Sequence, residues 1–249
     1  MIIARPVQYT SRVAQFRELF LALGLTELPS DLAGDATAAW SVFQAGSGRV
    51  GLHAVDAGDP LDGAATLGFE TDDLDGAAQR LAGTCTVRRF ERSDGKAVES
   101  KAADGLQLVL LAPTAGQATP QVTELAALGL WFTPNVPGAV TVLQQLGLTG
   151  EVRSDSGQWF QARADGGGLA AVHDGAAGKA QLSFEYAGDV AQLQRRLADR
   201  GVAADLVDES YGRTLLVARP GGGEPLWVNE RQTDLYGYVA LDSGRYSSG

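Results

Sequence analysis

The sequence is poor in cysteine. Cys85 is the only cysteine among 249 residues, so the chain cannot form an internal disulfide, and a reducing compartment is expected. The surrounding segment, GTCTV, contains no basic side chain that could activate the thiol. We therefore expect Cys85 to pack as a small apolar side chain rather than to act as a nucleophile.

Long apolar segments and clusters of basic residues are also missing. No apolar run approaches the roughly 20 residues that span a bilayer, and the first residues, MIIARPVQYT, lack the basic-then-apolar order of a signal peptide. The net charge of -10 argues against nucleic acid and anionic membranes as partners, because both attract clustered positive charge. These features predict a cytoplasmic protein whose partner is a small organic molecule, neutral or cationic.

What the sequence does contain is an internal duplication. Residues 7–26 align with residues 130–149 without a gap, and both segments end in LGLT. Further along, LGFETDDLDGAAQRLAG aligns with LSFEYAGDVAQLQRRLADRG. The equivalent residues include Trp40 and Trp159, His53 and His173, and Glu70 and Glu185. We expect the two tryptophans to fill the core or the contact between the halves.

Each half reads as two βαβββ modules. Apolar residues recur at helical spacing in four segments, which end at Gly24, Gly83, Gly147 and Gly201, and β-rich segments of strand length separate them. We expect a first domain at residues 1–113 (modules 1–55 and 56–113), a linker at 114–123, a second domain at 124–231 (modules 124–176 and 177–231) and a C-terminal tail at 232–249.

This arrangement resembles the vicinal oxygen chelate superfamily, which includes glyoxalase I, extradiol dioxygenases, fosfomycin-resistance enzymes and bleomycin-resistance proteins. The likeness covers residues 3–231 and rests on the strand–helix segments ending in LGLT and on FETDDLDGAAQRL. It implies an α+β fold in which each pair of modules forms one cupped, mixed β-sheet. It also implies that enzymes with this fold hold one divalent metal in the cup, through His, Glu or Gln on the first and last strands of both modules.

Most ligand positions implied by the resemblance carry unsuitable residues here. They fall on Arg5, Thr66, Val109 and either Gly51 or His53 in the first half, and on Leu128, Gln181, Trp227 and either Ala171 or His173 in the second. Neither half therefore offers more than one His and, in the second, one Gln. Because such an ion needs about three protein ligands with nitrogen, oxygen or sulfur donors, we expect no cofactor. The alternative is a divalent metal in a shifted site, held by His53 with Glu70 in the first half or by His173 with Gln181 and Glu185 in the second.

Strand alternation indicates which side chains face each cup. Residues two apart on a strand share a face, and apolar walls with a few polar groups are typical of small-molecule sites. The expected ligand-binding residues are Arg5, Tyr9, His53 and Glu70 in the first half, and Phe132, His173, Gln181, Glu185 and Trp227 in the second.

These patterns favour a metal-free protein of the glyoxalase/bleomycin-resistance type that sequesters or senses a small molecule, with antibiotics and secondary metabolites among the candidates. The first alternative is a divalent-metal-dependent lyase, isomerase or dioxygenase of the same superfamily. The second is a structural pseudo-enzyme without a ligand. One chain already contains paired modules, so a monomer suffices, and a homodimer is the other expected state.

Overall fold

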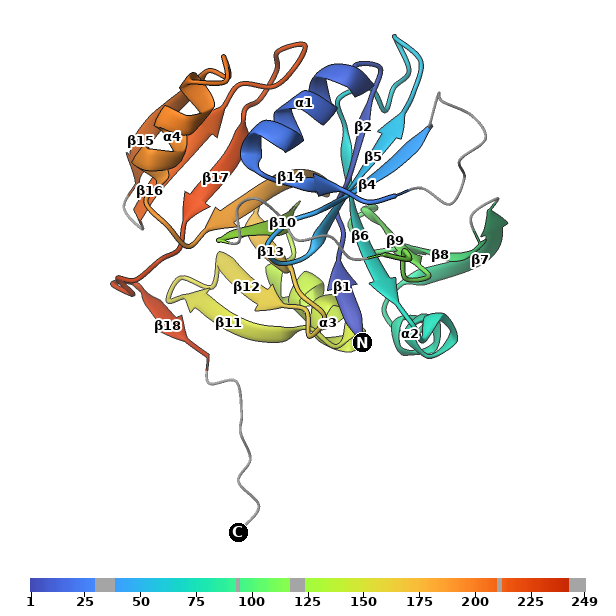
Figure 1. Cartoon of the computed structure of the whole chain (residues 1–249). Coiled ribbons are helices and arrows are strands. Elements are labelled where there is room, and N and C mark those ends of the chain that lie inside the picture. The colour runs from blue at the N-terminus through green and yellow to red at the C-terminus, as the bar shows by residue number, and fades with distance from the viewer. Residues whose placement is uncertain (30–38, 93–94, 117–123, 210–211, 242–249) are drawn as a thin grey trace.

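The computed structural model describes residues 1–29, 39–92, 95–116, 124–209 and 212–241. They form two mixed β-sheets, one from each half of the chain, with four helices (Figure 1). Among the described helices, none has the length and apolar character needed to cross a lipid bilayer.

The first sheet has the order β3-β4-β5-β2-β6-β9-β8-β7, and β1 pairs with β6. Its strands are β1 (Ile2–Ala4), β2 (Val7–Thr10), β3 (Thr26–Glu27), β4 (Trp40–Gln44), β5 (Arg49–Ala54), β6 (Ala65–Thr71), β7 (Thr86–Arg92), β8 (Gly95–Lys101) and β9 (Gln107–Leu111). Pro6 separates β1 from β2, because proline has no N–H to donate to a neighbouring strand.

The second sheet has the order β15-β16-β17-β14-β10-β13-β12-β11-β18. Its strands are β10 (Leu125–Thr133), β11 (Thr149–Ser154), β12 (Trp159–Arg163), β13 (Leu169–Asp174), β14 (Lys179–Tyr186), β15 (Ala204–Glu209), β16 (Gly212–Val217), β17 (Leu226–Glu230) and β18 (Tyr238–Ala240). The C-terminal tail thus contributes β18, which pairs with β11 at the sheet edge.

The helices follow the apolar periodicity of the sequence. They are α1 (Val13–Leu23), α2 (Leu74–Leu81), α3 (Val136–Leu146) and α4 (Val190–Ala198). Gly24 and Gly147 close α1 and α3 in the left-handed conformation, with φ of 94° and 99°. The ends of α2 and α4 differ from expectation, because Ala82 and Asp199 cap them in right-handed helical conformation before Gly83 and Gly201.

The apolar cores are shared between the two halves. One core joins α2 and the neighbouring strands of the first sheet to α3 and strands of the second sheet. The other joins α1 to α4 in the same way. Figure 1 shows α1 and α4 at one end of the molecule and α2 and α3 at the other. The helix-bearing faces therefore pack between the sheets, and the opposite, concave faces are left for ligands.

Candidate functional site

The concave face of the first sheet holds a buried carboxylate between two arginines. Arg5 Nη1 donates to Glu70 Oε1 at 2.7 Å, and Arg49 Nη1 donates to Glu70 Oε2 at 2.6 Å. The side chains of Glu70, Arg5 and Arg49 are 0%, 3% and 6% exposed. Charges buried to this degree are stable only when they are paired, so the cluster is a fixed part of the fold.

Residues that follow β9 close over this cluster. The backbone N–H and hydroxyl of Thr114 both donate to Glu70, at 3.1 and 2.9 Å. Arg49 in turn donates to the carbonyl oxygens of Thr114 and Gly116, at 2.9 and 3.0 Å. The chain itself therefore occupies the polar centre of the first concave face.

Aromatic side chains surround His53 next to this cluster. The ring centroids of Tyr9 and Trp40 lie 5.2 and 5.5 Å from that of His53, and Arg5 Cζ lies 5.1 Å above the Trp40 ring. Gly51 makes room for Trp40, because a Cβ at this position would lie 2.9 Å from the indole. The expectation that Trp40 fills the core or the contact between the halves is wrong, since its indole lies on the concave face.

The concave face of the second sheet is apolar at its centre. Its floor is a separate cluster of buried residues, formed by Ala126, Leu128, Leu130, Leu169 and Ala171. Three half-buried rings, those of Phe132, Trp159 and Trp227, pack against this floor. The expectation that Trp159 fills the core or the contact between the halves is therefore also wrong, because its indole lies on the second concave face.

His173 joins this aromatic group. Its ring centroid lies 5.4 Å from Phe132 and 5.9 Å from Trp159, and the Phe132 and Trp227 rings meet edge to face at 6.4 Å. His173 Nδ1 lies 2.5 Å from the carbonyl oxygen of Asp174. Because a carbonyl only accepts, Nδ1 carries the proton in the neutral ring and Nε2 remains an acceptor.

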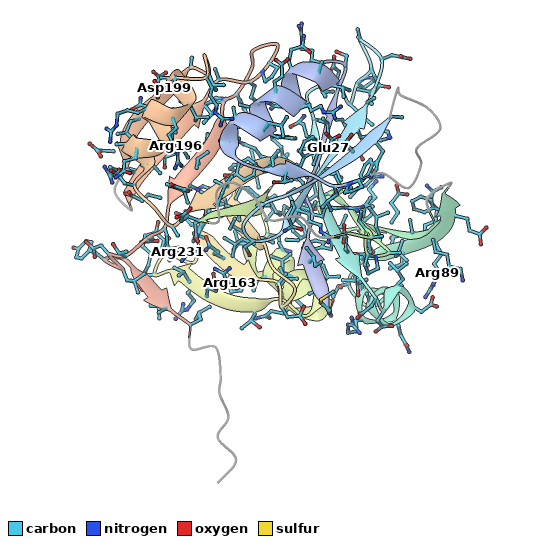
Figure 2. All side chains as sticks on the ribbon, viewed as in Figure 1. Glu27, Arg89, Arg163, Arg196, Asp199 and Arg231 are labelled. Carbon is cyan, nitrogen blue, oxygen red and sulfur yellow. The ribbon has the colours of Figure 1, made fainter. Side chains whose placement is uncertain are left out.

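Glu185 occupies the position equivalent to Glu70 but is held more loosely. Gln161 Nε2 donates to Glu185 Oε2 at 2.9 Å, and Arg231 Nε donates to Oε1 at 2.8 Å. The Arg231 side chain, which extends from the end of β17 and is labelled in Figure 2, is 49% exposed. The polar centre of the second concave face is thus covered by one solvent-accessible arginine rather than by a bound segment of chain.

The expected metal positions are occupied by residues that do not fit a divalent ion. In the second half, Leu128 belongs to the apolar floor, Trp227 to the aromatic group, and the Gln181 amide lies 3.4 Å from the Pro225 carbonyl oxygen. In the first half, Arg5 is itself a cation. Within the described part of the chain, no three His, Cys, Asp or Glu side chains gather closely enough to hold a metal. The shifted site is therefore not formed, and Glu70 is instead bonded to arginines.

Three residues of this region were missed by the sequence analysis as partners of the two glutamates. Arg49 on β5 and Gln161 on β12 reach the glutamates from strands that are not direct neighbours of β6 and β14, and Arg231 follows β17, which pairs with β14. The duplication does not reveal these residues, because their positions differ between the halves. Trp159 carried a usable signal, since it pairs in register with His173 on the next strand.

Comparison with solved structures identifies the fold. The chain is similar to the 2,3-dioxygenase LapB from Pseudomonas sp. KL28, with a TM-score of 0.64 and 15% identity over 94% of this chain and 92% of that chain. It is similar to a catechol 2,3-dioxygenase (0.62, 14%, 97% and 95%). A third neighbour is the homoprotocatechuate 2,3-dioxygenase of Brevibacterium fuscum with 3,4-dihydroxyphenylacetate (0.61, 15%, 92% and 78%). No protein-family model and no curated protein matches the sequence.

This likeness confirms the predicted α+β fold of the vicinal oxygen chelate superfamily, with two cupped, mixed sheets. At this level of identity it shows the fold alone. The neighbours named here are described as dioxygenases, and none of them is described as a resistance protein.

The expectation that no cofactor is needed is wrong by this comparison. One neighbour is described as an extradiol ring-cleaving dioxygenase, and the resemblance assigns a divalent metal to such enzymes, so the comparison points to a divalent metal rather than to none. The side chains at the usual ligand positions do not fit that ion in either half.

Proposed function

We propose that this protein binds a small aromatic molecule on the concave face of its second sheet. The observation that carries the proposal is the half-buried aromatic group of Phe132, Trp159 and Trp227 above a buried apolar floor. Ring surface that stays accessible above an apolar floor favours a flat, apolar guest, which gains both burial and edge or face contacts with the rings.

Polar groups beside the rings would orient this guest. His173 Nε2 can accept a hydrogen bond from a hydroxyl or amine, and Gln181 makes only one long hydrogen bond among the described residues. Glu185 adds a carboxylate that a ligand can reach by displacing Arg231. Aromatic faces also attract cations, so the cationic ligands expected from the acidic composition belong to the same proposal.

The duplication supports assigning the site to the second half. The first half has the same sheet and the equivalent carboxylate, but Thr114 and Gly116 already bond to the arginine–glutamate cluster there. In the second half the equivalent carboxylate of Glu185 is bonded by Gln161 and by the half-exposed Arg231. We therefore assign the guest to the second concave face, where a solvent-accessible side chain rather than main chain lies over the polar centre.

A ring-cleaving dioxygenase is the second candidate function. It is favoured by the fold neighbours, one of which is described with 3,4-dihydroxyphenylacetate bound. The aromatic guest is common to both candidates, and cleavage would add a step after binding. The two differ in whether the aromatic ring is opened and oxygen consumed.

Tryptophan fluorescence tests the binding site, because Trp159 and Trp40 are equivalent residues of the two halves. The wild-type protein would be titrated with phenol, catechol and 3,4-dihydroxyphenylacetate, and with cyclohexanol as the non-aromatic control. We expect saturable binding of an aromatic compound that weakens roughly fivefold in Trp159→Ala, since lost ring contacts of this kind are worth about 1 kcal/mol. Trp40→Ala is the matched control and keeps the wild-type affinity. Equal losses in both variants, or no aromatic binding, would refute the assignment.

Oxygen uptake separates the second candidate from the first. The purified protein would be analysed for bound metal and then assayed with the two dihydroxy compounds after addition of Fe²⁺ or Mn²⁺. Ring cleavage that requires the metal would establish the dioxygenase. Aromatic binding without oxygen uptake in any metal-supplemented sample would leave binding as the function.

A further inference from the structure

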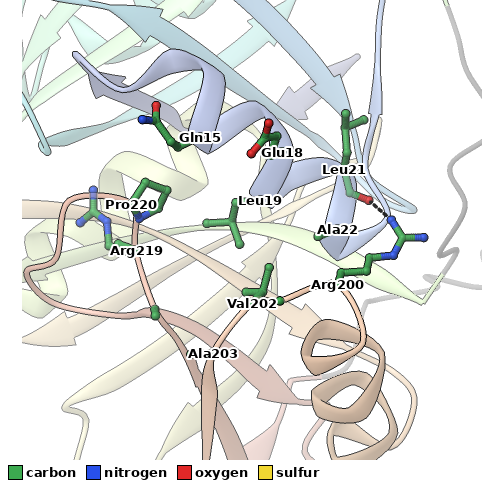
Figure 3. A pocket seen from close by; sticks show the side chains of 12 residues that line it. Gln15, Glu18, Leu19, Leu21, Ala22, Arg200, Val202, Ala203, Arg219 and Pro220 are labelled. Carbon is green, nitrogen blue, oxygen red and sulfur yellow. Dashed lines mark hydrogen bonds between the residues drawn. The ribbon is translucent and has the colours of Figure 1, made fainter.

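A second surface feature lies on the opposite side of the fold, between the two halves. A groove of about 600 Å³ runs between α1 and two connections of the second half, residues 200–203 after α4 and residues 218–220 between β16 and β17. Figure 3 shows the groove with α1 on one side and Val202 and Ala203 on the other. Small-molecule sites commonly lie at such contacts between domains and have comparable volumes.

The walls of the groove are apolar in the middle and charged at the ends. The buried Leu19 and the half-buried Ala22 of α1 line one wall, and Val202 and Pro220 line the other. Leu21, at the edge of the same helix, is 37% exposed. This surface suits the hydrocarbon part of a ligand.

Arg219 lies at one end of the groove, and no carboxylate of the described residues forms an ion pair with it. Its Nη2 donates to Gln8 Oε1 at 2.9 Å and to the Gly63 carbonyl oxygen at 2.7 Å, which are neutral acceptors. Its Nε is buried without a hydrogen-bond partner among the described residues. Burial lowers the pKa of Arg219, and Glu224, whose charge opposes that effect, is itself bonded to Lys179.

The other charged groups at the groove are Arg200 and Glu18. Arg200 Nη1 donates to the Leu21 carbonyl oxygen at 3.3 Å, as Figure 3 shows, and so also bonds to a neutral acceptor. Two guanidinium groups against one carboxylate leave the groove with a positive balance on a protein of net charge -10. Guanidinium groups pair well with carboxylates and phosphates because both are planar or multidentate acceptors.

We propose that this groove binds a small organic anion with an apolar body. Its carboxylate or phosphate pairs with Arg219 at one end of the groove, and its hydrocarbon part lies over Ala22 and Val202 toward Arg200 at the other end. The proposal is independent of the aromatic site, because the groove lies on the helix-bearing side and shares no residue with the concave face.

The duplication supplies a natural control for this site. The equivalent groove, between α3 and the residues after α2, has a volume of about 270 Å³ and contains Asp104 on the connection between β8 and β9. Asp104 Oδ2 accepts from Trp131 Nε1 at 2.8 Å, and Trp131 is the residue equivalent to Gln8. The partner of Trp131 is therefore acidic, whereas the partner of the equivalent Gln8 is the basic Arg219. We expect the equivalent groove to reject anions.

Isothermal titration calorimetry with octanoate tests the proposal, with octylammonium and 1-octanol as probes of the same chain length. We expect octanoate to bind at least tenfold more tightly than either control. Arg219→Gln should weaken octanoate at least tenfold, and Arg219→Lys less, because it keeps the charge. Ala203→Phe should block the groove, whereas Ala103→Phe, on the wall of the equivalent groove, should leave binding unchanged.

Several results would overturn this assignment. The assignment is wrong if octanoate does not bind at millimolar concentration or if 1-octanol binds equally well. It is also wrong if octanoate binding survives both Arg219→Gln and Ala203→Phe. Loss of octanoate binding in Trp159→Ala would place the anion on the concave face instead. Since Arg219 also joins the two halves through Gln8, thermal unfolding of each variant is measured, and Ala203→Phe keeps the test valid if Arg219→Gln does not fold.

Discussion

Two glutamates at equivalent positions have different roles in the two halves. Glu70 is fully buried between Arg5 and Arg49, whereas Glu185 is covered by a half-exposed arginine. Removing one partner of a buried ion pair leaves the other charge uncompensated in the interior, which is far more costly than breaking an accessible pair.

This difference predicts unequal effects of the same substitution. Glu70→Ala should lower the free energy of unfolding by about 3–5 kcal/mol, because two buried guanidinium groups lose their carboxylate. Glu185→Ala should lower it by only about 1 kcal/mol, because Arg231 can turn to water. Urea unfolding followed by circular dichroism measures both values, and equal losses would show that the two sites are held alike.

Cys85 is buried just before β7. Burial raises the pKa of its thiol, so a smaller fraction is thiolate at a given pH than in the unfolded chain. Alkylation by iodoacetamide at pH 8 should therefore be at least tenfold slower in the native protein than in urea. Labelling at the same rate in both states would contradict the predicted burial.

Among the elements, β18 protects the edge of the second sheet. It pairs with β11 through residues 238–240, and the Leu241 N–H donates to the Glu151 carbonyl oxygen at 2.8 Å. An uncovered edge strand can pair with another molecule. A chain ending at Leu235 should self-associate more than a chain ending at Leu241, as light scattering would measure. Equal scattering from the two would remove this role for β18.

The elements also show how far sequence reasoning reaches. Apolar spacing and the glycines at 24 and 147 predict α1 and α3 well, because both signals are local. The positions of Trp40 and Trp159 could not be predicted in the same way. The residues around a tryptophan on a strand do not show which face of the sheet its indole will occupy. Trp40 lies on the concave face because Gly51 leaves room for its indole there and because the helices pack against the opposite face.

The candidate site was predictable in part for a related reason. Strand alternation allows a choice of residues for each face, and Phe132, His173 and Trp227 do lie close together in the structure. The partners of Glu70 and Glu185 come from strands distant in sequence and differ between the halves, so neither spacing nor duplication reveals them. These partners meet the glutamates only because of the order of the strands in each sheet, and that order cannot be read from the sequence pattern around each residue.

At the scale of the whole molecule, the two halves are parts of one folding unit. Each apolar core contains residues from both sheets, and the helices pair across the halves, α1 with α4 and α2 with α3. Residues 1–116 and 124–249 expressed separately should therefore expose half of each core and lack cooperative unfolding. Co-expression should restore a stable complex. A cooperative thermal transition of either half alone would contradict the shared cores.

An aromatic guest on the second concave face, and not on the first, would be visible in a crystal structure of the protein with the tightest-binding aromatic compound from the fluorescence titration. We expect ligand density against Trp159 and Trp227 above Leu128, with the Arg5–Glu70–Arg49 cluster and Thr114 unchanged in the first half. Ligand density on the first concave face, or on neither, would contradict this expectation.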